Sequence, residues 1–152
     1  MIGKLNEEQI EQVLLSGLIG RIGCRDDNDI YVVPVNYVYD GKDIIAHSRP
    51  GKKIQMMRRT PAVCFEVEEL NSSTNWKTVI AHGTFQEITG NEERNAAMKL
   101  FVDRTIRLKI SETAILPETS GERIHPRSPG NISMVVYRIV LKEKTGRFET
   151  DQ

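Results

Sequence analysis

Residues 47–53, His-Ser-Arg-Pro-Gly-Lys-Lys, carry side chains of the types that bind phosphate. The segment joins a strand-like run to a helix start, because a proline at position 50 suits the first helical turn. Free backbone N–H groups at a helix N-terminus attract anions, and the helix dipole adds to the attraction. Lysine, arginine, histidine and serine supply the donors that grip a phosphate dianion. The spacing fits a phosphate site and a solvated basic turn equally well.

Other sequence signatures for nucleotides and metals are absent. Neither GxxxxGK[ST] nor GxGxxG occurs, so the sequence supports neither nucleotide hydrolysis nor a Rossmann dinucleotide site. The three histidines, His47, His82 and His125, lack a metal-ligand spacing such as HExxH, and no metal site is predicted. Cys24 and Cys64 lie in apolar runs without CxxC spacing, which is typical of buried, reduced thiols.

A proline interrupts the β-branched and aromatic run at residues 30–39, IYVVPVNYVY. Because proline cannot donate to a sheet ladder, Pro34 indicates an edge strand, a bulge or a ligand-contacting backbone. Asn36 and Tyr37 then add polar groups to an otherwise apolar strand. A flat heteroaromatic ring needs in-plane hydrogen-bond partners and apolar cover, and this strand offers both. An edge strand with a surface asparagine is the alternative.

Local patterns predict six strands and three helices. Asn6 reads as the N-cap of the first helix, with Gln9 as its capping-box partner, and Asp40-Gly41 is a hairpin signal. Hairpin-connected strands with peripheral helices favour an antiparallel barrel over a doubly wound sheet. Residues 105–130 are hard to interpret, and residues 142–152 are predicted to be a polar tail. The expected strands are 18–24, 30–39, 43–48, 62–70, 76–88 and 132–141, and the later helices are 50–59 and 90–104.

Length and charge narrow the classes of protein. A chain of 152 residues fits a single domain, residues 1–152. Lys and Arg together number 21, as do Asp and Glu, and a net charge of zero counts against a nucleic-acid partner. No apolar run approaches about 18 residues, and the first residues are charged, so we expect no membrane span, no secretory signal and a cytoplasmic location.

Several segments together resemble one protein family: residues 19–23, 33–41, 45–53, 63–67, 76–80 and 145–149. In order and spacing they are similar to the split-barrel proteins that bind flavin mononucleotide (FMN), specifically the pyridoxamine 5′-phosphate oxidase-like proteins related to nitroimidazole-resistance proteins. The resemblance covers nearly the whole chain. It implies a mainly β (α+β) fold, a six-stranded antiparallel split β-barrel with peripheral helices. It also implies a homodimer with FMN in the clefts at the subunit interface.

The resemblance assigns roles to individual residues as well. It implies that His47, Ser48, Lys52 and Lys53 hold the FMN phosphate, with Lys53 the stronger of the two lysines. The isoalloxazine ring would be lined by Pro34, Val35 and Asn36, with Glu66 on the adjacent strand. Trp76 would contribute its side chain near the cleft, from its own or the other subunit. Arg21 would face the flavin or pair with a carboxylate.

The activity implied is FMN-dependent reduction of a small, flat, electron-poor compound such as a nitroaromatic. Oxidation of pyridoxamine phosphate is less favoured, because the basic residues expected to hold that substrate's phosphate are not evident. A non-catalytic flavin or haem binder, acting as a sensor, is one alternative. A phosphate- or nucleic-acid-binding barrel that uses Lys52, Lys53, Arg58 and Arg59 is the other.

Overall fold

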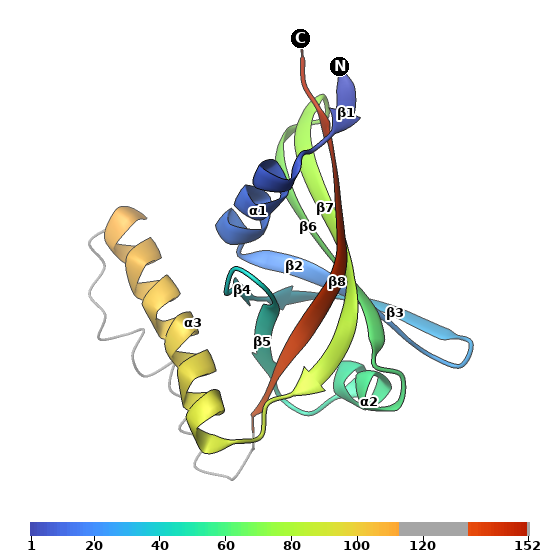
Figure 1. Cartoon of the computed structure of the whole chain (residues 1–152), viewed down its shortest axis with the longest axis vertical. Coiled ribbons are helices and arrows are strands. Elements are labelled where there is room, and N and C mark those ends of the chain that lie inside the picture. Colours follow the sequence, from blue (N-terminus) through green and yellow to red (C-terminus); the bar gives the residue numbers. More distant parts are fainter. Residues whose placement is uncertain (113–133, 152) are drawn as a thin grey trace.

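The computed structural model describes residues 1–112 and 134–151. Most of the segment 105–130, including His125, therefore lies outside the described residues. The elements are β1 (Ile2–Lys4), α1 (Glu7–Ser16), β2 (Ile19–Asp26), β3 (Asp29–Asn36), β4 (Val38–Tyr39), β5 (Ile44–Ser48), α2 (Lys52–Arg59), β6 (Ala62–Ser72), β7 (Asn75–Glu87), α3 (Asn91–Glu112) and β8 (Val135–Glu149) (Figure 1).

The strands form one antiparallel sheet in the order β3-β2-β6-β7-β8-β5-β4, with β1 added beside β8. The sheet curls without closing, so that its edges come together near β3 and β5. The predicted antiparallel split barrel is confirmed. Pro34 lies on β3, an edge strand, where its missing N–H leaves the sheet intact.

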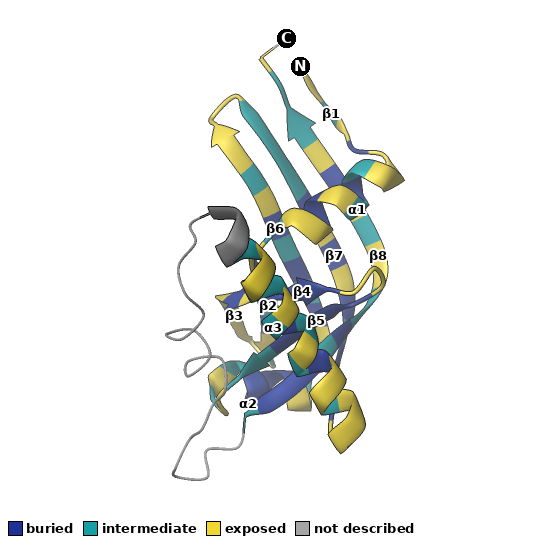
Figure 2. Ribbon diagram, turned by 90° about the vertical axis from the view of Figure 1, so that its left-hand side faces the viewer, coloured by how far each residue is buried: buried dark blue, intermediate teal, exposed yellow. Residues whose placement is uncertain are grey.

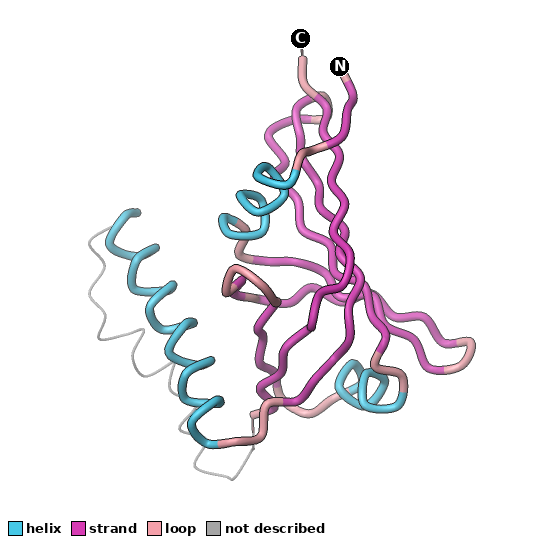
Figure 3. Tube along the Cα trace, viewed as in Figure 1, coloured by secondary structure: helices cyan, strands magenta, loops and turns pink. Residues whose placement is uncertain are grey.

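The number of strands and the end of the chain differ from the prediction. The sheet has eight strands rather than six, because the short β1 also pairs and because the predicted strand 30–39 is divided at Tyr37 into β3, which pairs with β2, and β4, which pairs with β5. Residues 142–149 belong to β8 and pair with β7, although the sequence predicts a polar tail. The inward positions of this segment are Lys144, Gly146 and Phe148, which weakens the apolar alternation that marks a strand. Both chain ends lie at the tip of the long β6–β7–β8 ribbon (Figure 3).

Two apolar clusters stabilise the fold. The larger fills the barrel, where α1 contributes Val13 and Leu14 and α2 contributes Ile54 and Met57. The smaller attaches α3 to the sheet through buried side chains. Figure 2 shows α3 in front of the barrel, on the side of β4 and β5, with an exposed outer surface. In the described part of the chain, no helix is long and apolar enough to cross a membrane.

Helix α1 is fixed at its start and along its side. The predicted capping box is confirmed, since Asn6 Oδ1 accepts from the Gln9 backbone N–H at 2.9 Å and Gln9 Oε1 accepts from the Asn6 N–H at 2.9 Å. Glu11 accepts a hydrogen bond from the Tyr39 hydroxyl at 2.5 Å and forms an ion pair with Lys144. These contacts attach the helix to β4 and β8.

Candidate functional site

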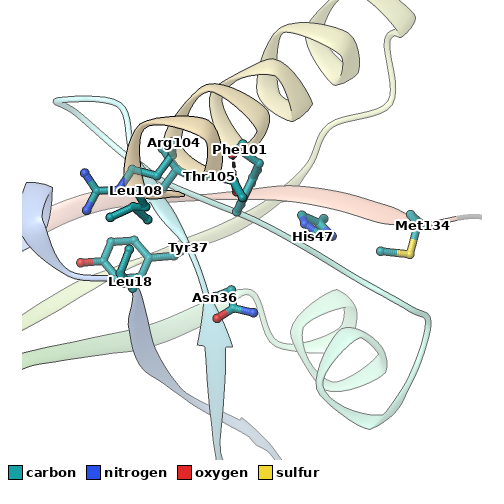
Figure 4. Close-up of a pocket in the computed structure, with 10 residues that line it drawn as sticks. Leu18, Asn36, Tyr37, His47, Phe101, Arg104, Thr105, Leu108 and Met134 are labelled. Carbon is teal, nitrogen blue, oxygen red and sulfur yellow. Dashed lines mark hydrogen bonds between the residues drawn. The ribbon is translucent and has the colours of Figure 1, made fainter. Parts of the chain in front are cut away.

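A cavity of about 360 Å³ opens where β3 ends beside β5, beneath α3. Figure 4 shows Asn36 and His47 on the strand side of this cavity, with α3 residues opposite them. Hairpin β4–β5 brings His47 back beside the end of β3, and the Asp40-Gly41 turn makes this possible because Gly41 adopts a positive φ of 92°. The cavity is lined by Leu18, Asn36, Tyr37, Val38, His47, Phe101, Arg104, Thr105, Leu108 and Met134.

His47 has an unused hydrogen-bonding atom. Its ring packs edge-on against Phe101, with the two ring centroids 4.6 Å apart. Its Nδ1 atom is buried and has no hydrogen-bond partner among the described residues. Burial lowers the pKa of His47, because desolvation disfavours the imidazolium form. A polar ligand atom in the cavity would satisfy the Nδ1 atom, which the described residues leave without a partner.

The N-terminus of α2 lacks the features that normally stabilise a helix start. Its N-cap, Gly51, offers no side-chain hydrogen bond, and the first turn carries lysines instead of acidic residues. Cations at the positive end of a helix dipole are unfavourable, so an anion bound there would offset both the dipole and the lysine charges. This is the predicted phosphate segment, and its chemistry fits a bound anion.

The two lysines of this turn differ in environment. Lys52 forms an ion pair with Asp29 at 3.3 Å, and its ammonium lies 4.7 Å from the centre of the Tyr31 ring. Lys53 is partly buried and has no ion-pair or hydrogen-bond partner within residues 1–112 and 134–151. Burial lowers the pKa of Lys53 through desolvation of the ammonium. Of the two lysines, Lys53 is therefore the one whose charge is available for a ligand.

Ser48 points to the opposite side of β5 from His47, since successive side chains of a strand alternate. Its hydroxyl donates to the backbone oxygen of Arg49 at 3.0 Å. The cavity lining does not include Ser48, Lys52 or Lys53. The predicted phosphate residues therefore surround the turn before α2, while His47 faces the neighbouring cavity.

The remaining basic residues of α2 are neutralised. Arg58 binds Glu87 through two nitrogens, at 2.6 and 2.9 Å. Arg59 binds Asp26 at 2.6 Å. With Lys52 also paired, these contacts leave little free positive charge on α2 for a phosphate backbone, which disfavours the nucleic-acid alternative.

Arg21, Pro34 and Glu66 form a row across three neighbouring strands, because Arg21 is opposite both Pro34 and Glu66 in the sheet register. Arg21 Nη1 lies 3.3 Å from Glu66 Oε2 and 3.3 Å from Glu68 Oε1. Thr78 Oγ1 donates to Glu66 Oε1 at 2.9 Å. In this chain Arg21 pairs with carboxylates, one of the two expected roles. The row lies on the outer face of the sheet.

Two further predicted residues lie away from the cavity. The Trp76 indole N–H donates to Glu149 Oε2 at 3.1 Å, near the β6–β7 turn. The Val35 side chain is only 8% exposed and packs in the barrel core, so only its backbone could touch a ligand. Of the predicted residues, Asn36 and His47 alone are among the described residues that line the cavity. Sequence reasoning missed Arg104, whose helix is brought to the cavity by tertiary packing.

An unclosed antiparallel barrel whose two edges flank a cleft defines the split-barrel class of proteins. The chain belongs to the pyridoxamine 5′-phosphate oxidase family, whose sequence model matches residues 6–148. This confirms the resemblance drawn from the sequence.

Individual proteins are similar to this chain in structure or in sequence. An FAD-binding protein from Mesorhizobium loti is similar in structure, with a TM-score of 0.74 and 25% identity over 99% of this chain and 98% of that chain. A proposed 5-nitroimidazole antibiotic resistance protein from Bacteroides thetaiotaomicron has a TM-score of 0.69 and 19% identity, over 97% of this chain and 87% of that chain. An uncharacterized protein of Rhizobium meliloti is 32% identical over 88 residues, and this match spans 58% of each chain.

Proposed function

We propose that this protein binds FMN, with the phosphate at the start of α2 and the ring in the cleft beside Asn36 and His47. The observation that carries the proposal is Lys53, a partly buried ammonium at an uncapped helix N-terminus, with no partner among the residues that the structure describes. A phosphate dianion would supply the missing countercharge. Family membership and the FAD-binding relative support a flavin as the bearer of that phosphate.

The cleft residues suit the edge and faces of a flat ring. Asn36 carries an amide with both donors and acceptors, and His47 Nδ1 is unpartnered. Phe101 and Leu18 supply apolar cover in the same cavity. These residues would hold and orient the ring and exclude water from one side of it.

We further propose a homodimer formed through the outer face of the sheet. This face exposes apolar side chains, among them Ile30 at 77% and Val32 at 64%. Exposed apolar groups on one sheet face mark an interaction surface. A second copy on this face would cover Arg21 and Glu66 and would bring Trp76 toward the cleft of its neighbour.

The activity that we propose is reduction of a small electron-poor compound such as a nitroaromatic. The bound flavin would relay two electrons, taken as hydride from a reduced nicotinamide. Reduction of a nitro to a nitroso group consumes those two electrons and two protons and releases water. The chain's contribution is to position the flavin and the substrate, and to leave one flavin face accessible from the cavity.

The test is a titration of flavin-free protein with FMN, FAD and riboflavin, followed by flavin fluorescence. We expect FMN to bind more tightly than riboflavin, because riboflavin lacks the phosphate. Loss of absorbance of a reduced nicotinamide in the presence of a nitroaromatic would then establish turnover. Protein that takes up no flavin would refute the binding proposal, and a bound flavin without turnover would favour the non-catalytic sensor. A Soret band in the purified protein would favour haem.

A further inference from the structure

Arg104 lines the cavity and has no carboxylate partner among the described residues. Its Nη2 donates to the backbone oxygens of Ser16 at 3.0 Å and Gly17 at 3.5 Å. No ion pair involves Arg104 in the described part of the chain. Arg58, Arg59 and Arg138, by contrast, each bind carboxylates outside the cavity.

The other described residues that line the cavity carry no negative charge either. Among its described lining residues there is no Asp or Glu, and the polar ones are Asn36, His47 and Thr105. The Arg104 guanidinium is the one permanent charge in that set. It has five N–H donors, and those on Nε and Nη1 are not used by the two backbone oxygens. The guanidinium is only partly buried and already binds the C-terminal carbonyls of α1, and an anionic ligand in the cavity would use its remaining donors.

The positions of the lining residues separate a flavin end from a second end. Figure 4 shows Asn36 on the side toward α2, where the proposed phosphate site lies, while Arg104, Leu18 and Tyr37 gather at the opposite side. The contacts agree, because Arg104 reaches Gly17, the residue next to Leu18. A molecule stacked against the ring would therefore meet Arg104.

We propose that Arg104 is a specificity-determining residue that selects substrates carrying a carboxylate on a small flat ring. This inference rests on the proposed flavin function and names the substrate class for it. Leu18 and Phe101 would cover the apolar part of the substrate, and the free donors of Arg104 would bind the carboxylate.

Arg104 also has a structural role, since it binds the C-terminal carbonyls of α1. The Tyr37 hydroxyl caps the same helix end by donating to the Leu14 backbone oxygen at 2.7 Å. A test must separate this cap from ligand selection. Arg104→Gln keeps an amide donor for the carbonyls and removes the charge. Lys99→Gln is the matched control, because it removes an exposed charge from α3 outside the cavity.

The probes are 4-nitrobenzoate and 4-nitrobenzamide, which share a ring and a nitro group and differ in charge. Dissociation constants are measured calorimetrically on the protein with and without FMN, and KM values during turnover. We expect the native protein and Lys99→Gln to prefer the benzoate, and Arg104→Gln to weaken benzoate binding about tenfold or more while changing benzamide binding little. Equal weakening of both probes, or no preference in the native protein, would overturn the inference. Failure to bind FMN would instead refute the proposed function. The calorimetry without FMN reports the preference of Arg104 separately, so the two failures can be distinguished.

Discussion

Replacing Lys53 by methionine is expected to weaken FMN binding without destabilising the free protein. Methionine has nearly the length of lysine and no charge. The Lys53 ammonium is partly buried, and nothing in the described chain pairs with it. Removing it therefore breaks no ion pair and relieves desolvation, so the melting temperature of the flavin-free variant should equal or exceed that of the native protein.

The loss of affinity follows from the hydrogen bonds to phosphate. A hydrogen bond to a charged group contributes about 1.5–3 kcal/mol, which corresponds to a rise of roughly ten- to hundredfold in the dissociation constant. Riboflavin has no phosphate, so its affinity should not change. The comparison between FMN and riboflavin thus isolates the phosphate from any disturbance of the ring site.

Flavin fluorescence titrations of Lys53→Met provide the measurement. Lys42→Met is the matched control, because Lys42 is exposed in the β4–β5 turn, away from α2. Lys52→Met should have a smaller effect than Lys53→Met, since its ammonium already pairs with Asp29. If FMN binds Lys53→Met as tightly as the native protein, or if riboflavin and FMN weaken equally, the phosphate does not bind at α2.

Three further substitutions probe the barrel, the attachment of α1 and the outer face. Gly20→Ala should cost about 1–3 kcal/mol in urea unfolding, because an added Cβ would lie 2.2 Å from the buried Phe65 ring, whereas Gly90→Ala, with open space around it, should be nearly neutral. Burial opposes ionisation of Glu11, but its hydrogen bonds from a lysine and a tyrosine outweigh this and hold its pKa below the ordinary value. The Glu11 contribution is thus present at neutral pH and lost as pH falls through that lowered pKa, so Glu11→Gln should be less stable by up to about 1 kcal/mol at pH 7 and equally stable in strong acid. Ile30→Glu should halve the molar mass measured by light scattering without lowering monomer stability, because Ile30 is 77% exposed.

The parts of the fold that local chemistry determines could be predicted from the sequence. The Asn6 and Gln9 cap and the Asp40-Gly41 turn are short-range signals, and both are present. The end of β8 was missed for a physical reason. Lys144 occupies an inward position, where Glu11 pairs with it, and Gly146 fits closely beneath Leu5. Neither residue type indicates a buried strand face, because the partner that makes each one suitable is distant in sequence.

The residues of the candidate site also differ in whether local sequence could indicate them. Asn36 and His47 are adjacent to local signals, a strand proline and a basic turn, and both line the cavity. Arg104 lies in a helix whose position depends on Ala97 and Phe101 packing against distant strands, so nothing near it in sequence identifies it. That Lys53 has no ion-pair partner in the described part of the chain could not be predicted either, because it depends on which acidic residues come near α2.

The outer face and the cleft are continuous along β3, and this links the proposed dimer to the proposed ligand. Ile30, Val32, Pro34 and Asn36 alternate on the same side of the strand, and all four are exposed. Asn36 also lines the cavity, so the apolar surface leads directly into it. A second copy packed on Ile30 and Val32 would therefore form part of the cleft wall. Flavin binding and dimer formation must then strengthen each other, since linkage between two equilibria is reciprocal. On this reasoning the Ile30→Glu variant loses FMN affinity although Ile30 itself lies outside the cavity.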